Sequence, residues 1–163
     1  MDFEISHTIS AGVDDVAAAL LDPDYQASLS DIGPLKERAV LEQSDLGNGH
    51  VRRRVRCVLA LDVSGAARRF LGDSDPAWIE EAVWQPERLA WEWRIVPEVA
   101  GELLDAAGTI TVTAAGEGTK RVVAGRVHVK VPFYGGKVER VVVDGLRRTY
   151  DEEAQRLAEW LAP

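Results

Sequence analysis

The sequence contains very little cysteine and no long apolar run, and each absence excludes a class of protein. Cys57 is the only cysteine among 163 residues, so the chain can form neither an internal disulfide nor a zinc site built from cysteines. No run of eighteen apolar residues occurs, which argues against a transmembrane helix. The first ten residues, MDFEISHTIS, carry neither a basic leader nor an apolar stretch. These features predict a cytoplasmic protein without integral membrane association.

Positive charge is also scarce. Lys and Arg together number 19 against 27 Asp and Glu, which gives a formal net charge of -8. Nucleic acids and anionic membranes bind basic patches, so we expect neither as the main partner. Gly135 and Gly136 begin a predicted helix and lack the Lys-Ser ending of a phosphate-binding loop. We expect no cofactor.

The three histidines do not predict a metal site. His7 lies on the apolar face of the first predicted strand, whereas His128 points to the opposite face of a later strand by alternation, and His50 belongs to a turn. We interpret His7 as a hydrogen-bonded core residue, with an acid or base role as the alternative.

Apolar residues make up 46% of the chain, which is enough to build one hydrophobic core, and we expect a single domain over residues 1–163. Their spacing follows a period of two in seven segments and a helical period in three others. We predict strands at 2–10, 35–44, 51–61, 78–84, 89–96, 103–114 and 120–131, and helices at 13–21, 23–30 and 135–161.

This order predicts an α+β fold: one strand, two short helices, six further antiparallel strands and a long C-terminal helix. The last helix spans about 40 Å at about 1.5 Å per residue and therefore needs a broad surface beneath it. A curved antiparallel sheet wrapped around such a helix leaves room for a ligand cavity.

The element order, the tryptophan-rich segment WIEEAVWQPERLAWEWRIVP and the terminal amphipathic helix resemble the helix-grip (SRPBCC) superfamily. This superfamily includes START lipid-transfer domains, birch-pollen-allergen-like proteins and polyketide cyclases. More narrowly, the chain is similar to a bacterial branch catalogued as a domain of unknown function. The resemblance covers nearly the whole chain and implies an apolar pocket between sheet and helix. It carries over no catalytic residue, because no catalytic motif of a characterised member is present.

The aromatic residues give the candidate pocket. On the predicted strands 78–84 and 89–96, large aromatic rings share one face, where they either fill the core or line a cavity. The long helix supplies the opposite wall, and a loop residue is placed at the mouth. The candidate ligand-binding residues are Phe70, Trp78, Trp91, Trp93, Tyr134, Val142, Leu146 and Tyr150.

Arg52, Arg54 and Arg56 share one strand face and are expected to form a solvated outer surface, paired with carboxylates such as Glu42 or Glu80. The alternative is an acidic ligand or partner. The other carboxylates have no spacing that specifies an acid–base pair.

We therefore expect binding or transport of a hydrophobic small molecule, such as a lipid, sterol or polyketide-like compound. A cyclase or dehydratase-type enzyme acting on a hydrophobic substrate is the first alternative, and a protein–protein interaction module is the second. A convergent polar pair inside the cavity would favour the enzyme.

Overall fold

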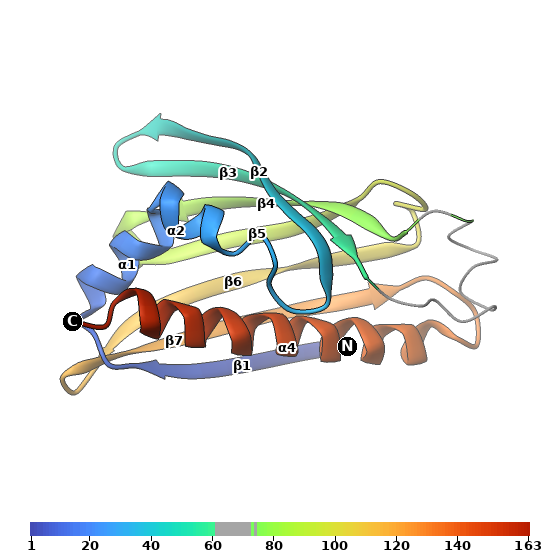
Figure 1. The fold of residues 1–163 in the computed structure, drawn as a ribbon. Helices are drawn as coiled ribbons and strands as arrows, with labels where there is room; N and C mark the ends of the chain where they lie inside the picture. Colours follow the sequence, from blue (N-terminus) through green and yellow to red (C-terminus); the bar gives the residue numbers. More distant parts are fainter. Residues whose placement is uncertain (61–72, 74) are drawn as a thin grey trace.

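The computed structural model describes residues 1–60, 73 and 75–163, and within them seven strands form one antiparallel sheet in the order β1-β7-β6-β5-β4-β3-β2 (Figure 1). The strands are β1 (Asp2–Ile9), β2 (Leu35–Gly47), β3 (His50–Leu59), β4 (Ala77–Gln85), β5 (Ala90–Pro97), β6 (Leu104–Ala115) and β7 (Gly118–Val129). The helices are α1 (Val13–Leu21), α2 (Pro23–Ser28), the 3-10 turn η1 (Pro86–Arg88) and the long α4 (Gly135–Trp160).

This architecture confirms the predicted α+β class and the helix-grip arrangement. Each predicted strand and helix has a counterpart within a few residues, although residue 61 of one predicted strand lies outside the described part of the chain. None of the described helices is both long and apolar enough to cross a membrane.

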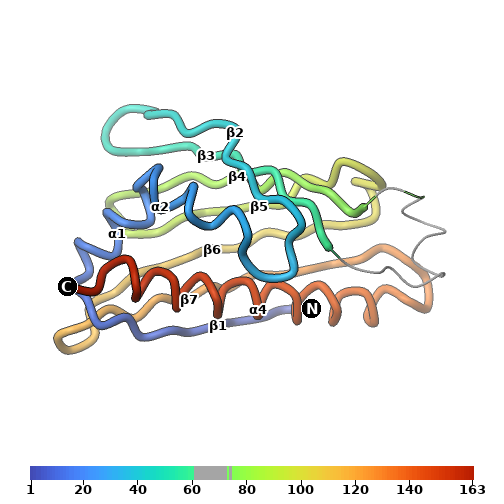
Figure 2. The backbone as a smooth tube through the Cα atoms, in the orientation of Figure 1, coloured from blue at the N-terminus to red at the C-terminus, as the bar shows by residue number. Residues whose placement is uncertain are grey.

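The long helix α4 covers one face of the sheet, which we call the inner face (Figures 1 and 2). It runs beside β7 and β1 and contacts both strands. The short helices α1 and α2 lie at the end of the sheet where the C-terminal end of α4 is found. Tyr25 connects these parts: its hydroxyl in α2 donates a hydrogen bond to the Glu153 carbonyl of α4 at 3.2 Å.

The buried stripe of α4 differs from the predicted one. Val143, Tyr150, Ala154 and Leu157 are buried, as the helical period requires for residues on one side. Val138, which the sequence placed in this stripe, is instead 37% exposed. The side of α4 that faces the sheet is therefore rotated relative to the predicted stripe.

The strand register places one row of inner-face residues across the middle of the sheet. Arg53 of β3, Trp93 of β5, Gly108 of β6, Gly125 of β7 and Phe3 of β1 fall in this row. The two glycines make room for the indole ring, because a Cβ atom on Gly125 would lie 2.8 Å from Cζ2 of Trp93. Close packing of the ring on bare backbone follows from this pair of glycines.

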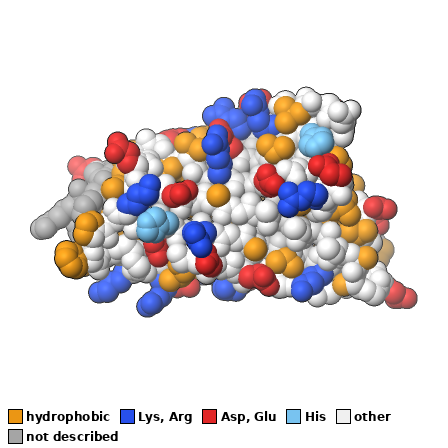
Figure 3. Space-filling view, turned by 180° about the vertical axis from the view of Figure 1, so that it is seen from behind, with side chains coloured by type: hydrophobic (Ala, Val, Ile, Leu, Met, Phe, Trp, Pro, Cys, Tyr) orange, Lys and Arg blue, Asp and Glu red, His pale blue; other side chains and the backbone are white. Residues whose placement is uncertain are grey.

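The opposite, outer face is polar, with acidic and basic side chains interspersed over it (Figure 3). Arg52, Arg54 and Arg56 all point there, which confirms the predicted solvated face. Arg52 pairs with Glu42 at 2.9 Å, as predicted. The remaining ion pairs of this face include Arg54–Glu81, Arg56–Glu37, Arg56–Glu98 and Arg94–Glu81.

Candidate functional site between the sheet and the long helix

The inner face is accessible at one end and closed at the other. Trp78 at the start of β4 and Trp84 near its end lie on the same face, but Trp78 is half-buried whereas Trp84 is only 3% exposed. Leu104, Val142 and Leu146 are also half-buried and pack against the core. We call Trp78, Leu104, Val142 and Leu146 the apolar end of the site.

Six of the candidate pocket residues lie between the inner face of the sheet and α4. Trp91 and Trp93 of β5 point inward and are 1% and 3% exposed, and Tyr150 of α4 is buried as well. The other three candidates, Trp78, Val142 and Leu146, belong to the apolar end. Every one of these six side chains lies on the inner face of the sheet or on the half of α4 that packs with the core.

Two candidates do not join this group. Tyr134 is 56% exposed and immediately precedes α4, whose first turn has no side-chain cap from it. Phe70, the candidate at the mouth, lies outside the described residues.

A set of polar residues occupies the inner face deeper than the apolar end. Arg53, Glu80, Arg121, Tyr150 and Glu153 are close enough for their charges to shift one another's pKa, and we call them the polar cluster. They come from β3, β4, β7 and α4, so long-range pairing brings them together. The sequence interpretation named only Tyr150 as part of a site.

Arg121 is the most deeply buried charged side chain of the cluster, with no exposed surface. Its Nη2 lies 3.0 Å from Oε2 of Glu153, an ion-pair contact without hydrogen-bond geometry. Its guanidinium carbon lies 5.4 Å from the centre of the Tyr150 ring. Burial lowers the pKa of Arg121, but Glu153, Tyr150 and Tyr25 raise it more, so this guanidinium carries a fixed positive charge.

Arg53 anchors the short helices to the sheet. Its Nη1 donates to the carbonyl of Leu20, near the end of α1, at 2.8 Å, and Gln26 Nε2 donates to the same oxygen at 3.0 Å. Arginine donors at the last carbonyls of a helix satisfy acceptors that have no partner within the helix. The guanidinium also stacks on Trp91 at 4.1 Å. Burial lowers the pKa of Arg53 to about 10, so it stays charged at neutral pH.

Glu80 corrects the sequence interpretation, which paired it with the outer arginines. Strand alternation places Glu80 on the face of Trp78 and Trp84, and its cross-strand partner in β3 is Val55. The residue is partly exposed, yet protein surrounds the carboxyl closely enough that desolvation raises its pKa, against the opposite effect of Arg38 and Arg53. Glu80 is therefore an inward, partly accessible acid.

Burial also suppresses ionisation of Tyr150 and Cys57. It raises the pKa of Tyr150 well above its ordinary value, and nearby Glu80 and Glu153 add to this effect. Burial likewise raises the pKa of the Cys57 thiol to about 12, so this thiol stays protonated at neutral pH. No thiolate or phenolate is available at neutral pH as a nucleophile from these two residues.

The histidines lie apart, as expected from alternation. His7 Nε2 lies 2.8 Å from Asp151 Oδ1, which agrees with a hydrogen-bonded role for this inner-face residue. His128 contacts Glu139 and His50 contacts Glu87. Among the residues that the structure describes, no group of three or more His, Cys, Asp and Glu side chains could hold a metal ion.

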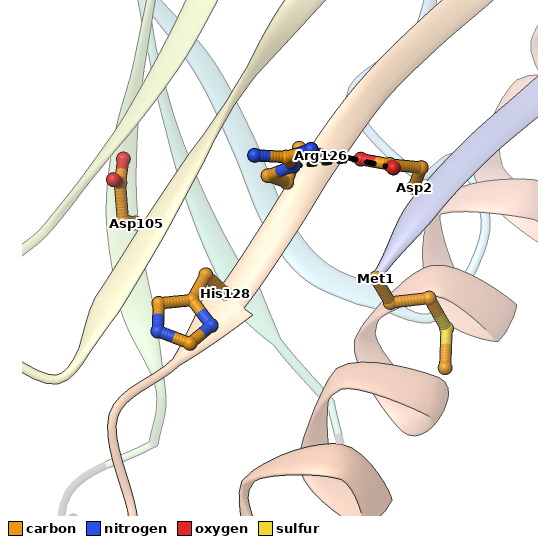
Figure 4. A pocket seen from close by; sticks show the side chains of 5 residues that line it. All are labelled: Met1, Asp2, Asp105, Arg126 and His128. Carbon is orange, nitrogen blue, oxygen red and sulfur yellow. Dashed lines mark hydrogen bonds and ion pairs between the residues drawn. The ribbon is translucent and has the colours of Figure 1, made fainter.

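A depression lies on the outer face and does not join the site. It measures about 440 Å³ and is lined by Met1, Asp2, Asp105, Arg126 and His128 (Figure 4). Arg126 is already paired with Asp2 at 2.7 Å, and the lining is open and charged. An apolar molecule would find no enclosed surface there, so the inner face remains the candidate site.

Comparison with known proteins supports the fold assignment. A family described as "Protein of unknown function (DUF2505)" matches residues 4–161. No match was found among curated proteins.

Solved structures of similar shape have low sequence identity to this chain. TTHA0849 from Thermus thermophilus has a TM-score of 0.70 at 17% identity, covering 99% of this chain and 100% of that chain. The ZhuI aromatase/cyclase from Streptomyces sp. R1128 has a TM-score of 0.66 at 14% identity, covering 98% and 92%. A START superfamily protein from Mycobacterium smegmatis has a TM-score of 0.63 at 12% identity, covering 98% of each chain. These likenesses show a shared fold.

Proposed function

Because the chain belongs to the DUF2505 family and has the helix-grip fold, we propose that it binds or carries an apolar small molecule between the inner face and α4. The observation that carries this proposal is the partial exposure of large apolar side chains that face inward. Trp78, Val142 and Leu146 pack against the core and yet retain accessible surface. A fully packed core leaves almost no such surface on inward-facing residues.

The proposed wall consists of residues from both layers. Trp93 packs the edge of its ring over Gly108 and Gly125 in the middle of the sheet. Val142 and Leu146 form the opposite side from α4. Helix-grip superfamily members bind hydrophobic ligands or act as cyclases, and the solved neighbours include a START superfamily protein and an aromatase/cyclase.

Filling the proposed space tests the proposal. We expect Leu146→Trp to abolish uptake of apolar probes such as 1-naphthol with little loss of stability, because the larger ring occupies space meant for ligand. Val141→Trp is the matched control, since Val141 lies on the same helix and is 53% exposed. Titrations followed by tryptophan fluorescence measure the uptake. Strong destabilisation by Leu146→Trp with unchanged uptake would identify this position as solid core.

Native mass spectrometry of the protein purified from its own host provides the second test. A retained apolar molecule that is missing from the Leu146→Trp variant would support the proposal and reveal the ligand's mass. A host-purified protein without any bound small molecule, which also fails to take up apolar probes, would contradict it.

A second candidate function is a cyclase or dehydratase-type reaction on such a molecule. Glu80 favours it, because it is an inward, partly exposed residue and desolvation raises the pKa of its carboxyl, which is the state of a general acid. If host-derived ligand is turned over, Glu80→Gln should abolish the turnover while ligand still binds. Equal turnover by the variant would exclude Glu80 as the acid.

A further inference from the structure

Among the residues that the structure describes, several hydrogen-bond donors on the inner face have no hydrogen-bond partner. Arg121 is without a hydrogen-bond partner at Nε, Nη1 and Nη2, and Nε of Arg53 is unpaired as well. The indole nitrogens of Trp91 and Trp93 are also unpaired. These six buried nitrogens are all donors, so the interior around the polar cluster is short of acceptor oxygens.

Burying donors without acceptors lowers the stability of the folded protein. A buried charge needs an ion pair and hydrogen bonds for its remaining donors, and Arg121 has one ion pair, with Glu153, among the described residues. Each unsatisfied buried donor loses its hydrogen bonds to water without replacement. A ligand that brought acceptor oxygens would remove this deficit.

The charges facing the cluster also favour an anion. Arg38, Arg53 and Arg121 act on it from β2, β3 and β7, whereas Glu80 and Glu153 are the carboxylates that oppose them. Because burial raises the pKa of Glu80, its negative charge is suppressed further. The interior thus carries a local excess of positive charge inside a chain whose formal net charge is -8.

We propose that the polar cluster binds the carboxylate of an amphipathic ligand, with Nε and Nη1 of Arg121 donating hydrogen bonds to its oxygens. The ligand's apolar part then extends past Trp93 toward the apolar end at Trp78 and Leu146. This inference rests on the proposed function and specifies the class of molecule. Since the unpaired donors have no exposed surface, the side chains of Tyr150 and Glu153 on α4 must shift when the carboxylate enters.

Decanoic acid and decan-1-ol test this inference, because they share one alkyl chain and differ in charge at neutral pH. Calorimetric titration at pH 7.5 should give at least about tenfold tighter binding of decanoate than of the alcohol, the size expected for a charge-assisted hydrogen bond. The variant Arg121→Met/Glu153→Gln, which removes both charges so that neither is left uncompensated, should lose this preference and keep its affinity for the alcohol.

Arg126→Met is the matched control, since Arg126 lies on the same strand but on the outer face, where it pairs with Asp2. It should leave both affinities unchanged. Circular dichroism and thermal melting establish whether each variant is folded. If the double variant does not fold, Arg121→Lys, which keeps the positive charge, provides a second test. It should keep the preference for decanoate in weakened form.

The outcomes separate this inference from the proposed function. Equal affinities of the wild type for acid and alcohol, or equal losses of both in the Arg121 variants, would overturn the carboxylate site while apolar binding stands. If the wild type binds neither compound nor 1-naphthol, both proposals fail.

Discussion

Neighbouring residues of the same type meet opposite conditions on the two faces of this sheet. On β3, Arg52 points outward and pairs with Glu42 in solvent, whereas Arg53 points inward, stacks on Trp91 and holds the end of α1. On β4, the outward Glu81 has its pKa lowered by Arg94, whereas the inward Glu80 has its pKa raised by burial. Two charged residues that are adjacent on one strand therefore differ in role: the outward one is solvated, whereas the inward one is buried at a cost in free energy.

The comparison predicts the largest effect for a buried charge that loses its partner. Arg121→Met leaves Glu153 without its ion pair, and we expect the free energy of unfolding to fall by about 3–5 kcal/mol. Urea denaturation followed by circular dichroism measures this change. Adding Glu153→Gln to the variant should restore most of the loss, because no uncompensated charge remains. A single variant as stable as the wild type would contradict the ion-pair assignment.

The inner face also has little tolerance for added volume. In Gly125→Ala the new methyl group would meet the Ala107 carbonyl oxygen at 2.6 Å and the Trp93 ring at 2.8 Å. Because backbone must move to relieve this overlap, we expect a loss of about 1–3 kcal/mol in the free energy of unfolding.

Gly136→Ala is the control for this substitution, since a Cβ atom there meets nothing within 4 Å. It lies in the first turn of α4 and should leave stability unchanged or slightly raised. If both variants unfold at the same urea concentration, the close packing of Trp93 on Gly125 is not a constraint on the fold.

Glu80→Gln and Glu81→Gln should change the pH dependence of stability in opposite directions. The folded pKa of Glu80 is raised, so the folded state binds more protons and stability falls as pH rises from the unfolded pKa through the folded one. Glu80→Gln should therefore gain stability relative to the wild type at pH 7 and lose this advantage near pH 4. The folded pKa of Glu81 is lowered, so its contribution is present at pH 7 and is lost as pH falls through that pKa.

Urea denaturation of both variants between pH 4 and pH 8 measures the two trends. Glu81→Gln should be less stable than the wild type at pH 7, with the difference shrinking toward acid. Parallel curves for the two variants would show that Glu80 and Glu81 share one environment, against the assignment of opposite faces.

The sequence predicted the sheet, the long helix and the inward tryptophans, because these depend on local periodicity. Strand alternation also predicts that Glu80 points inward, because residues 78, 80 and 84 share a face. It predicts the same for Arg53, because its neighbours Arg52 and Arg54 point outward. The prediction that Glu80 pairs with the outer arginines was wrong because a charged side chain was assumed to be solvated.

Other parts of the site could not be found from the pattern. The contact of Arg121 with Glu153 joins β7 to α4, and Arg53 reaches the Leu20 carbonyl across 33 residues of chain. Such contacts depend on the position and orientation of the helices on the sheet, which strand periodicity does not determine. The rotation of α4 that buries Val143 and exposes Val138 has the same origin.

The smallest effect is expected on the outer face, where the same change of residue type is made on the same strand as in Arg121→Met. Arg126 pairs with Asp2 at 2.7 Å, but both side chains are more than 70% exposed, so water replaces the lost partner for either charge. Arg126→Met should therefore unfold at a urea concentration indistinguishable from that of the wild type, and raising the salt concentration should not separate the two curves. A loss approaching that of Arg121→Met would mean that strand position, and not burial, sets the energetic role of these arginines.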